Sequence, residues 1–377
     1  MSRGLPAGLR RIVFWQPIVS PHQYDFLEAL SAAIPCEVIL AAESGLPAER
    51  VLQGWRQSPH EKVRVVDVST AEGFKTLVAH RGADSLHVFS GFFSHAIVWR
   101  AFRLLSTSSA RFAILSEAPE QGPWAGWLKR ARGRLLVRRW GSRVDFVLAM
   151  GDVGRRFFES VGFPREKIGV FGYYLAVPTE PWPADDRNAD GVFRFVAAGQ
   201  LIRRKGFDLL LAALEGMEGL EGLEGMPWRC DLYGNGPLRN DLRRAAERLR
   251  IADQIGFHAP LPNEAIRRAI AGSDCCVVPS RHDGWGMVVN EALIAGTPVV
   301  CSDGCGAAAM LDDPEGGTVV PAGRVRPLAE ALQRSLSAGK IGFSGRRRVH
   351  AVAERFSPAA GVRLFLNRLE SLEPTFR

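Results

Sequence analysis

The sequence predicts an α/β protein built of two parallel-sheet domains. Its 377 residues exceed what one hydrophobic core usually organises. Short apolar runs alternate with helix-like segments, and a proline-rich, acidic stretch interrupts this alternation at residues 173–191. Strands that alternate with helices imply crossover units and therefore parallel sheets with helices on both faces. The hydrophobic fraction of 46% and the charged fraction of 23% are near globular averages and argue against disorder.

The first domain is expected over residues 1–172. Apolar runs typical of buried strands lie at 11–15, 36–43, 63–68, 85–91, 111–117 and 145–150. Helix-like periods lie between them, at 24–33, 74–82, 95–106 and 153–162.

The linker is expected over residues 173–191 because the stretch has three prolines and no period. The strand–helix alternation then restarts and predicts a second domain over residues 192–350. Its expected strands are 193–199, 228–234, 254–259, 275–280, 297–303 and 317–323, and its expected helices 206–216, 238–251, 262–273 and 286–296. Residues 351–377 are expected to contain a last helix, which Ser357 and Pro358 open. Two such domains facing each other would leave a central cleft at the carboxyl ends of both sheets, where open α/β folds bind ligands.

The net charge of +8 is unevenly distributed. Residues 1–172 carry 23 Lys and Arg against 15 Asp and Glu, whereas residues 173–377 carry 25 of each. The excess is densest over residues 126–143, which hold seven Lys and Arg and no acid, interleaved with Trp127, Leu135, Leu136, Val137 and Trp140 and preceded by Trp124. Such a stretch suits an anionic membrane surface, although a solvated basic helix has the same composition. A nucleic-acid partner is not expected, because no recognition motif accompanies the charge.

The chain is expected to stay in the cytoplasm, where it can also bind the inner face of the membrane peripherally. No stretch approaches the roughly 18 consecutive apolar residues of a spanning helix, and the first residues lack the apolar core of a signal peptide. The six cysteines show no CxxC spacing, so buried reduced thiols are expected instead of zinc ligands or disulfides.

The strongest candidate site is the segment RHDGWGMVVNEALIAG at residues 281–296. It leaves a strand, crosses a polar loop with Gly284 and Gly286, and enters an apolar helix. The free N–H groups of Gly286, Met287 and Val288 can therefore face a phosphate at the helix N-terminus. Asp283 and Glu291 border this position and suit sugar hydroxyls on either side of the phosphate. The simpler alternative is that Asp283 caps the helix and Glu291 lies on its solvated face.

The first domain offers three further candidates. His22 and Gln23 follow the first strand in QPIVSPHQ, where Ser20 is expected to cap the next helix; His22 can serve the site or only pair within this cap. Glu117 lies in SEAPEQG, which follows the apolar run RFAIL, and can bind hydroxyls, act as a base or be a buried structural acid. His95 can reach the site or simply start its helix.

The segment 279–303, PSRHDGWGMVVNEALIAGTPVVCSD, resembles the signature of the retaining glycosyltransferase family 4, which has the GT-B fold of two Rossmann-like domains. AAGQLIRRKGFDLLLAAL at 197–214 is similar to the Gly-Arg-Leu and Lys-Gly block of that family. Residues of the first domain, such as SEAP and LAMGDVGRRFFESVGFP, resemble a bacterial polysaccharide and lipopolysaccharide branch. The resemblance implies that the C-terminal helix returns to the first domain.

The resemblance also implies roles for single residues. Lys205 would neutralise the donor diphosphate, Asp283 would contact the transferred sugar and Glu291 would bind the ribose. The remaining donor-side candidates are Gly199, Gln200, Arg204, Gly234, Gly236, Phe257, His258, Gly284, Gly286, Met287 and Val288. Some of them have a plainer interpretation: Lys205 as a solvated loop charge, Gly234 and Gly236 as a turn, and His258 as a strand-end histidine.

Two departures from the family pattern concern charge and reach. Asp283 is one methylene shorter than the usual Glu. Gln200 stands where the family often has Arg, so Arg203 or Arg204 either compensates for the missing charge or lies on the surface.

The expected function is a retaining glycosyltransferase that moves a sugar from a nucleotide-diphosphate-sugar donor to a lipid-linked or polysaccharide acceptor in cell-envelope glycan synthesis. Its expected catalytic residues are Asp283, Lys205, Glu117 and His22. No cofactor or metal ion is expected, because no DxD motif follows a strand and Asp312 and Asp313 belong to a loop. The alternatives are a catalytically inactive scaffold of the same fold, whose basic helix binds a partner, and a nucleotide-sugar epimerase.

Overall fold

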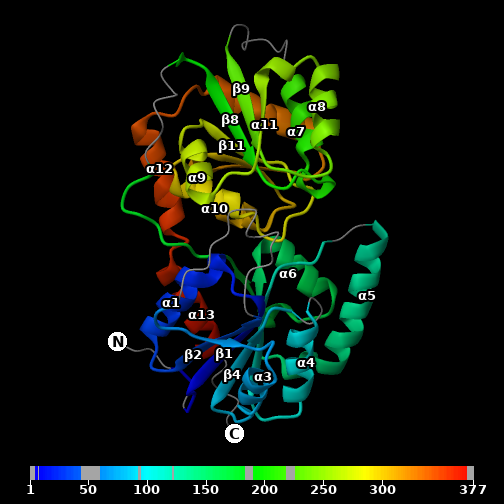
Figure 1. Cartoon of the computed structure of the whole chain (residues 1–377), viewed down its shortest axis with the longest axis vertical. Coiled ribbons are helices and arrows are strands. Elements are labelled where there is room, and N and C mark those ends of the chain that lie inside the picture. The colour runs from blue at the N-terminus through cyan, green and yellow to red at the C-terminus, as the bar shows by residue number, and fades with distance from the viewer. Residues whose placement is uncertain are drawn as a thin grey trace. The chain divides into compact units, whose positions relative to one another are not determined.

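A computed structural model describes residues 5–6, 8–43, 60–91, 95–120, 123–182, 190–217 and 226–371 (Figure 1). The chain forms two compact units. Unit 1 contains the described residues up to Ala176 together with the chain from Phe356, and unit 2 contains Val177–Arg355. The first boundary lies inside the stretch expected to be the linker, of which residues 183–189 are outside the described part.

Unit 1 contains a seven-stranded sheet in the order β3-β2-β1-β4-β5-β6-β7, and all of its neighbouring strands are parallel. Its strands are β1 Arg11–Ile18, β2 Glu37–Glu43, β3 Arg64–Asp67, β4 Ser85–Phe89, β5 Arg111–Ser116, β6 Phe146–Met150 and β7 Ile168–Phe171. Its helices are α1 Tyr24–Ala33, α3 Ala71–Val78, α4 Ala96–Leu105, α5 Pro123–Trp140, α6 Gly151–Ser160 and α13 Pro358–Glu370, with 3-10 turns η1 Pro21–Gln23, η2 Gly141–Arg143 and η3 Arg165–Lys167.

Unit 2 contains a six-stranded parallel sheet in the order β10-β9-β8-β11-β12-β13. Its strands are β8 Phe193–Ala198, β9 Trp228–Tyr233, β10 Ile255–His258, β11 Cys275–Val278, β12 Val299–Ser302 and β13 Gly317–Val320. Its helices are α7 Phe207–Glu215, α8 Arg239–Arg248, α9 Asn263–Ala271, α10 Met287–Ile294, α11 Val325–Ser337 and α12 Phe343–Glu354, with 3-10 turns η5 Arg203–Lys205, η6 Ala252–Gln254, η7 Gly306–Met310 and η8 Pro314–Gly316.

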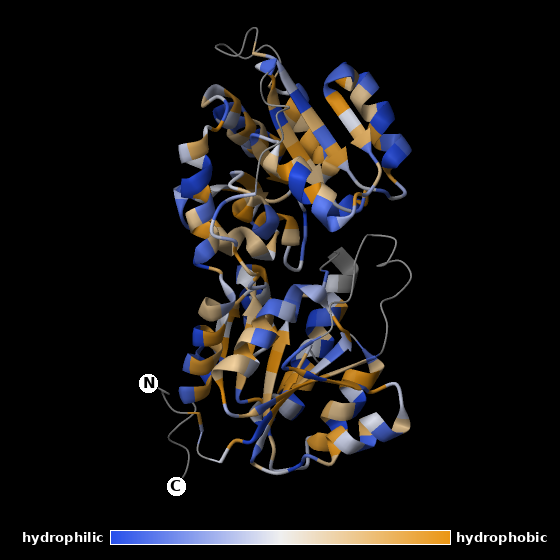
Figure 2. Cartoon of the chain, turned by 60° about the vertical axis from the view of Figure 1, so that its left-hand side comes forward, coloured by the Kyte–Doolittle hydropathy of each residue, from blue (hydrophilic) through white to orange (hydrophobic). Residues whose placement is uncertain are grey.

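Each sheet is apolar on both faces, as its sequence predicts. The central strands β4 and β11 are buried along their whole length, and Figure 2 shows the strands of both units as predominantly hydrophobic ribbons. Each unit has a hydrophobic core of its own. All six cysteines are free and buried. The two-domain parallel-sheet prediction is confirmed.

The C-terminal helix α13 belongs to unit 1, although it follows unit 2 in the chain. It packs on α1, and the Phe365 ring contacts the rings of Phe14 and Phe26. Ser357 occupies the N-cap position, but its side chain makes no capping hydrogen bond. The return of this helix to the first domain is therefore confirmed.

Several local predictions were incomplete; helices α11 and α12, for example, were not predicted. Strand β7 was not predicted, because it has only four residues, IGVF, and Gly169 interrupts its apolar run. Strand β1 continues through Ile18, so Gln16 lies on a strand and not in the loop that was expected. Helix α3 starts at Ala71 instead of Phe74, because the Thr70 hydroxyl accepts a hydrogen bond from the Gly73 N–H.

Within the ranges described above, no helix combines the length and apolar character that crossing a bilayer requires.

Candidate functional site

The candidate site of unit 2 lies where its strand order reverses. Strand β8 has β9 on one side and β11 on the other, and chain direction along the sheet changes at β8. In an open parallel sheet this reversal leaves a crevice at the carboxyl ends of the strands. The segment Gly199–Lys205 follows β8 and the segment Pro279–Gly286 follows β11, so both predicted motifs start at this crevice.

Lys205 and Asp283 are directly paired across the two segments. The Lys205 ammonium donates a hydrogen bond to the Asp283 carboxylate, although 78 residues separate them. The Arg204 guanidinium lies 3.6 Å from the other oxygen of the same carboxylate. Only 18% of the Lys205 side chain and 10% of the Asp283 side chain are exposed. Neither group is therefore a solvated surface charge.

The choice between Arg203 and Arg204 follows from the same geometry. Arg204 contacts Asp283, whereas the Arg203 side chain is exposed. The Arg203 carbonyl accepts a hydrogen bond from Arg281, which also forms a bidentate ion pair with Asp208. Arg204 therefore supplies the second positive charge beside Lys205, and Arg281 anchors the loop that carries Asp283.

Helix α10 starts at the same crevice. Its N-cap is Gly286, with φ of 96°, a left-handed conformation that glycine adopts without strain. A Cβ at this position would collide with the Cys305 thiol, which donates a hydrogen bond to the Trp285 carbonyl. No side chain caps the helix, so the capping alternative for Asp283 is wrong. The N–H groups of Met287 and Val288 precede the first intrahelical acceptors of α10.

Glu291 lies one turn further along α10, on the same helix face as Met287. Its side chain is 16% exposed, so the alternative that Glu291 lies on a solvated helix face is wrong. Burial raises the pKa of Glu291 to about 7, and Arg267 opposes this shift with its Nε 3.8 Å from the carboxylate. Arg267 also lies over the Trp182 ring, 4.9 Å from its centre.

The loops that follow β9 and β10 complete this edge of the sheet. The Leu201 N–H donates to the Asn235 carbonyl, which lies between Gly234 and Gly236. The His258 ring bonds the Asp231 carboxylate at 2.6 Å and stacks on Tyr233.

The sequence did not single out Arg239, which has a central place in these loops. Its guanidinium donates to the backbone carbonyls of Gly234, Phe257 and His258. Arg239 therefore ties the ends of β9 and β10 together.

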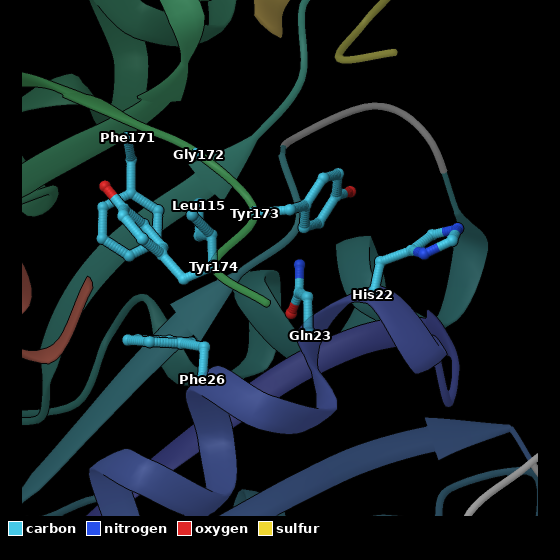
Figure 3. A pocket seen from close by; sticks show the side chains of 8 residues that line it. All are labelled: His22, Gln23, Phe26, Leu115, Phe171, Gly172, Tyr173 and Tyr174. Atoms are coloured by element: carbon cyan, nitrogen blue, oxygen red, sulfur yellow. The ribbon is translucent and has the colours of Figure 1, made fainter. Parts of the chain in front are cut away.

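A second cluster lies at the carboxyl edge of the unit 1 sheet. The Tyr173 hydroxyl donates a hydrogen bond to the Glu117 carboxylate at 2.9 Å, and the Tyr173 ring lies 5.9 Å from the His22 ring. The amide nitrogen of the buried Gln16 side chain donates a hydrogen bond to the side-chain oxygen of Gln23. Figure 3 shows His22, Gln23 and Tyr173 around one small pocket, which Phe26, Leu115, Phe171, Gly172 and Tyr174 also line.

The structure also tests the expectations for Glu117 and Ser20. Glu117 is exposed, so the alternative of a buried structural acid is wrong. Ser20 precedes η1 but makes no side-chain capping bond.

Tyr173 was not predicted, because it lies in the stretch expected to be the linker. His95 stands at the N-cap position of α4 without a capping bond, and burial lowers its pKa.

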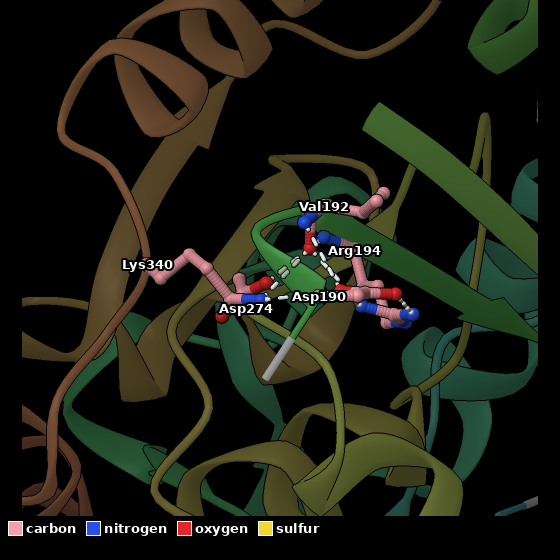
Figure 4. A network of polar contacts seen from close by, with 5 residues as sticks. All are labelled: Asp190, Val192, Arg194, Asp274 and Lys340. Atoms are coloured by element: carbon pink, nitrogen blue, oxygen red, sulfur yellow. Dashed lines mark hydrogen bonds and ion pairs between the residues drawn. The ribbon is translucent and has the colours of Figure 1, made fainter. Parts of the chain in front are cut away.

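The opposite edge of the unit 2 sheet carries a structural ion network (Figure 4). The Arg194 guanidinium donates to Asp190, Lys340 donates to the Val192 carbonyl, and the buried Asp274 accepts from the Arg194 N–H. The network joins the start of β8 to the start of β11, away from the candidate site. Across the described ranges, no group of three His, Cys, Asp or Glu side chains is arranged to hold a metal ion.

Residues 179–367 match the family model described as "Glycosyl transferases group 1". The chain is 27% identical over 249 residues to the GDP-mannose-dependent alpha-(1-6)-phosphatidylinositol monomannoside mannosyltransferase of Mycolicibacterium smegmatis. That match covers 61% of this chain and 64% of the relative, so it spans less than two thirds of the relative's length.

Solved structures show the same fold. Anabaena HepE, in complex with UDP and glucose, superposes with a TM-score of 0.69 at 15% identity, covering 96% of this chain and 100% of that one. The lipopolysaccharide outer core galactosyltransferase WaaB in its apo form also gives a TM-score of 0.69 at 15% identity, covering 96% and 99%. Both units of the chain therefore have counterparts in known structures.

Proposed function

Because this chain belongs to the glycosyl transferases group 1 family and is a glycosyltransferase, we propose that it moves a sugar from a nucleotide-diphosphate-sugar donor to a lipid-linked or polysaccharide acceptor with retention of configuration. The observation that carries this proposal is the buried ion pair of Lys205 and Asp283 beside the N-terminus of α10. A cation next to unpaired helix N–H groups is an arrangement suited to a diphosphate.

On the donor side, Lys205 and Arg204 stabilise the negative charge that develops as the diphosphate leaves, and the first N–H groups of α10 hold its distal phosphate. Asp283 positions the two cations and accepts hydrogen bonds from the transferred sugar. Glu291 accepts hydrogen bonds from the ribose. Because cations and amides supply this charge stabilisation, the proposed reaction needs no divalent metal ion.

Retention of configuration follows from attack on the face that the diphosphate leaves. The bond between the anomeric carbon and the diphosphate oxygen breaks, and the leaving diphosphate takes the electron pair. The acceptor oxygen forms the new bond and passes its proton to the diphosphate. Asp283 is a weak candidate for a covalent nucleophile, because two cations hold its carboxylate.

On the acceptor side, we propose that Glu117 and His22 bind the hydroxyl groups of the acceptor. Glu117 is exposed, carries a carboxylate and is oriented by the Tyr173 hydroxyl. The name of the relative from Mycolicibacterium smegmatis contains phosphatidylinositol monomannoside, a glycolipid, and this supports an acceptor carried on a lipid. An enzyme that uses such an acceptor would work in cell-envelope glycan synthesis at the cytoplasmic face of the membrane.

A donor screen by mass spectrometry, with Lys205→Ala beside the wild-type protein, tests this function. We expect one nucleotide sugar to give free nucleotide and a glycosylated acceptor, and Lys205→Ala to lower this turnover by about a hundredfold or more. Arg203→Ala, which removes an exposed charge from the same turn, is the matched control and should retain turnover. Glu117→Gln should raise the KM for the acceptor and leave donor binding unchanged.

Three outcomes would contradict the proposal. Equal turnover in Lys205→Ala and the wild-type protein would refute the donor assignment. Interconversion of nucleotide sugars without nucleotide release would identify an epimerase. Failure of every donor to turn over, with a folded protein, would identify an inactive scaffold.

A further inference from the structure

Helix α5 packs on unit 1 through one face only. Gly126 and Gly133 are buried, and a Cβ on Gly133 would lie 2.6 Å from the side chain of Val161. Leu136, Val137 and Trp140 pack against the core of unit 1, and the Trp140 ring contacts Trp99 of α4 edge to face. Three of the apolar residues that the sequence suggested for a membrane-facing surface are therefore used to hold the helix in place.

The outward face of α5 carries a different apolar set. Trp127, Leu128 and Leu135 have exposed fractions of 62%, 60% and 69%. Leu128 and Leu135 are seven residues apart and so lie on the same helix face. Large apolar side chains that are this exposed and lie close together on one helix often mark an interaction surface.

Arginines alternate with these apolar side chains along the outward face. Arg132 lies between Leu128 and Leu135, and Arg139 follows one turn later. Arg134 and Arg138 lie seven and eleven residues after Trp127 and therefore on the same side of the helix as Trp127. All four arginines are exposed, and residues 123–143 contain no acidic residue.

We propose that the outward face of α5, formed by Trp127, Leu128, Leu135 and the intervening arginines, docks unit 1 on an anionic lipid bilayer. An α-helix of this length spans about 27 Å and can lie along the interface, with its apolar side chains among the acyl chains and its guanidinium groups at the lipid phosphates. The alternation of apolar and cationic groups fits a bilayer surface better than a nucleic acid, which would leave Leu128 and Leu135 in water. The inference deepens the proposed function, because a membrane-docked enzyme meets a lipid-linked acceptor at the bilayer.

Vesicle flotation of the full-length protein tests this docking without any donor or acceptor, so its outcome is independent of the proposed sugar transfer. We expect binding to vesicles of phosphatidylglycerol with phosphatidylcholine and much weaker binding to phosphatidylcholine alone. Increasing salt should weaken the binding. The double variant Arg132→Gln, Arg138→Gln should lower the partition constant about thirtyfold, since each cation near an anionic surface accounts for about a fivefold change.

A second variant tests the apolar part of the same face. Leu128→Gln with Leu135→Gln should lower the partition constant by about tenfold or more while leaving the helix charge unchanged. Two double variants outside α5 are matched controls: Arg165→Gln with Arg326→Gln removes exposed charges, and Phe343→Gln with Leu364→Gln removes exposed apolar groups. Circular dichroism checks that every variant is folded.

The proposal is overturned if the wild-type protein binds neutral and anionic vesicles equally, or if the control variants lose as much binding as the α5 variants. Unchanged binding of both α5 variants at low salt would also overturn it. Tighter binding to a mixed-sequence nucleic acid than to the anionic vesicles, abolished by the same arginine substitutions, would replace the bilayer by a nucleic-acid partner.

Discussion

Asp283 illustrates how the role of one residue depends on its partners. Its side chain is a methylene shorter than the Glu expected from the family pattern, yet it reaches both Lys205 and Arg204. Two cations around one buried carboxylate leave a net positive charge at the crevice, which favours an anionic ligand. Arg204 thus lies where it can supply the positive charge that Gln200 lacks.

We predict that Glu291 lowers the stability of the folded protein above pH 7 while it contributes to donor binding. Its folded-state pKa of about 7 lies above the usual 4.5, so the folded protein holds the proton more tightly than the unfolded chain. The associated stability is complete below pH 4.5 and is lost as the pH rises through about 7. Glu291→Gln should therefore increase the free energy of unfolding by up to about 3 kcal/mol above pH 7, and by little in acid. The same variant should raise the KM for the donor.

Chemical denaturation of the unliganded protein across this pH range measures the effect. Arg267→Leu is the converse variant: without this cation the pKa of Glu291 should rise further, and the loss of stability should move to higher pH. A Glu291→Gln protein whose stability gain is the same in acid and in alkali would show that burial of the carboxylate is not the cause.

At the scale of elements, α13 depends on one close approach. A Cβ on Gly361 would lie 2.5 Å from the ring of the buried Tyr174. The glycine therefore lets the helix backbone rest on this ring, and Phe365, one turn further on, reaches Phe14 and Phe26. The position of this helix on unit 1 therefore depends on side-chain size at Gly361 as well as on the packing of Phe365.

Gly361→Ala should destabilise the protein, although alanine is favoured over glycine in a helix by about 1 kcal/mol. The clash with Tyr174 should cost about 1–3 kcal/mol, because the ring is buried and cannot move into solvent. Equilibrium unfolding in denaturant measures the change. In a Tyr174→Leu background the same substitution should cost less, and a stabilising effect of Gly361→Ala in the wild-type background would contradict the packing argument.

At the scale of the whole molecule, the two units carry buried groups with opposite pH behaviour. In unit 1, burial lowers the pKa of His87 to about 4, and its ring accepts a hydrogen bond from Trp15 and donates one to the His80 carbonyl. In unit 2, burial raises the pKa of Glu291. The His87 contribution should therefore weaken unit 1 in acid, whereas the Glu291 contribution should weaken unit 2 in alkali.

Calorimetry with limited proteolysis, which identifies the unit that unfolds first, tests this difference. The unfolded chain protonates His87 near pH 6.5 while the folded chain does not, so unit 1 should lose up to about 3 kcal/mol as the pH falls from 6.5 to about 4. His87→Asn, which keeps an acceptor for Trp15, should remove this acid sensitivity. Identical acid sensitivity in His87→Asn would show that other groups are responsible.

Most of the fold and part of the site could be predicted from local patterns. Residues 24–33 have a helical period and form α1 over the same residues, while the buried runs of β4 and β11 are long enough to recognise. Strand β7 escaped prediction because an edge strand of four residues has no continuous apolar run. Tyr173 escaped because composition alone marked its segment as a linker, whereas its hydrogen bond to Glu117 is a contact between distant parts of the chain.

The two parallel sheets follow from local sequence patterns, since runs that are apolar on both faces can only be buried between layers of helices. The loop and helix start at residues 281–296 follow in the same way, because the glycines and the apolar period are local. Tertiary packing, in contrast, pairs Lys205 with Asp283 and leaves only 16% of the Glu291 side chain exposed. It also turns Leu136 inward on α5 while Leu135 faces outward. Pairing, burial and the direction of a helix face are set by what the rest of the chain packs against each residue, and no local pattern encodes this.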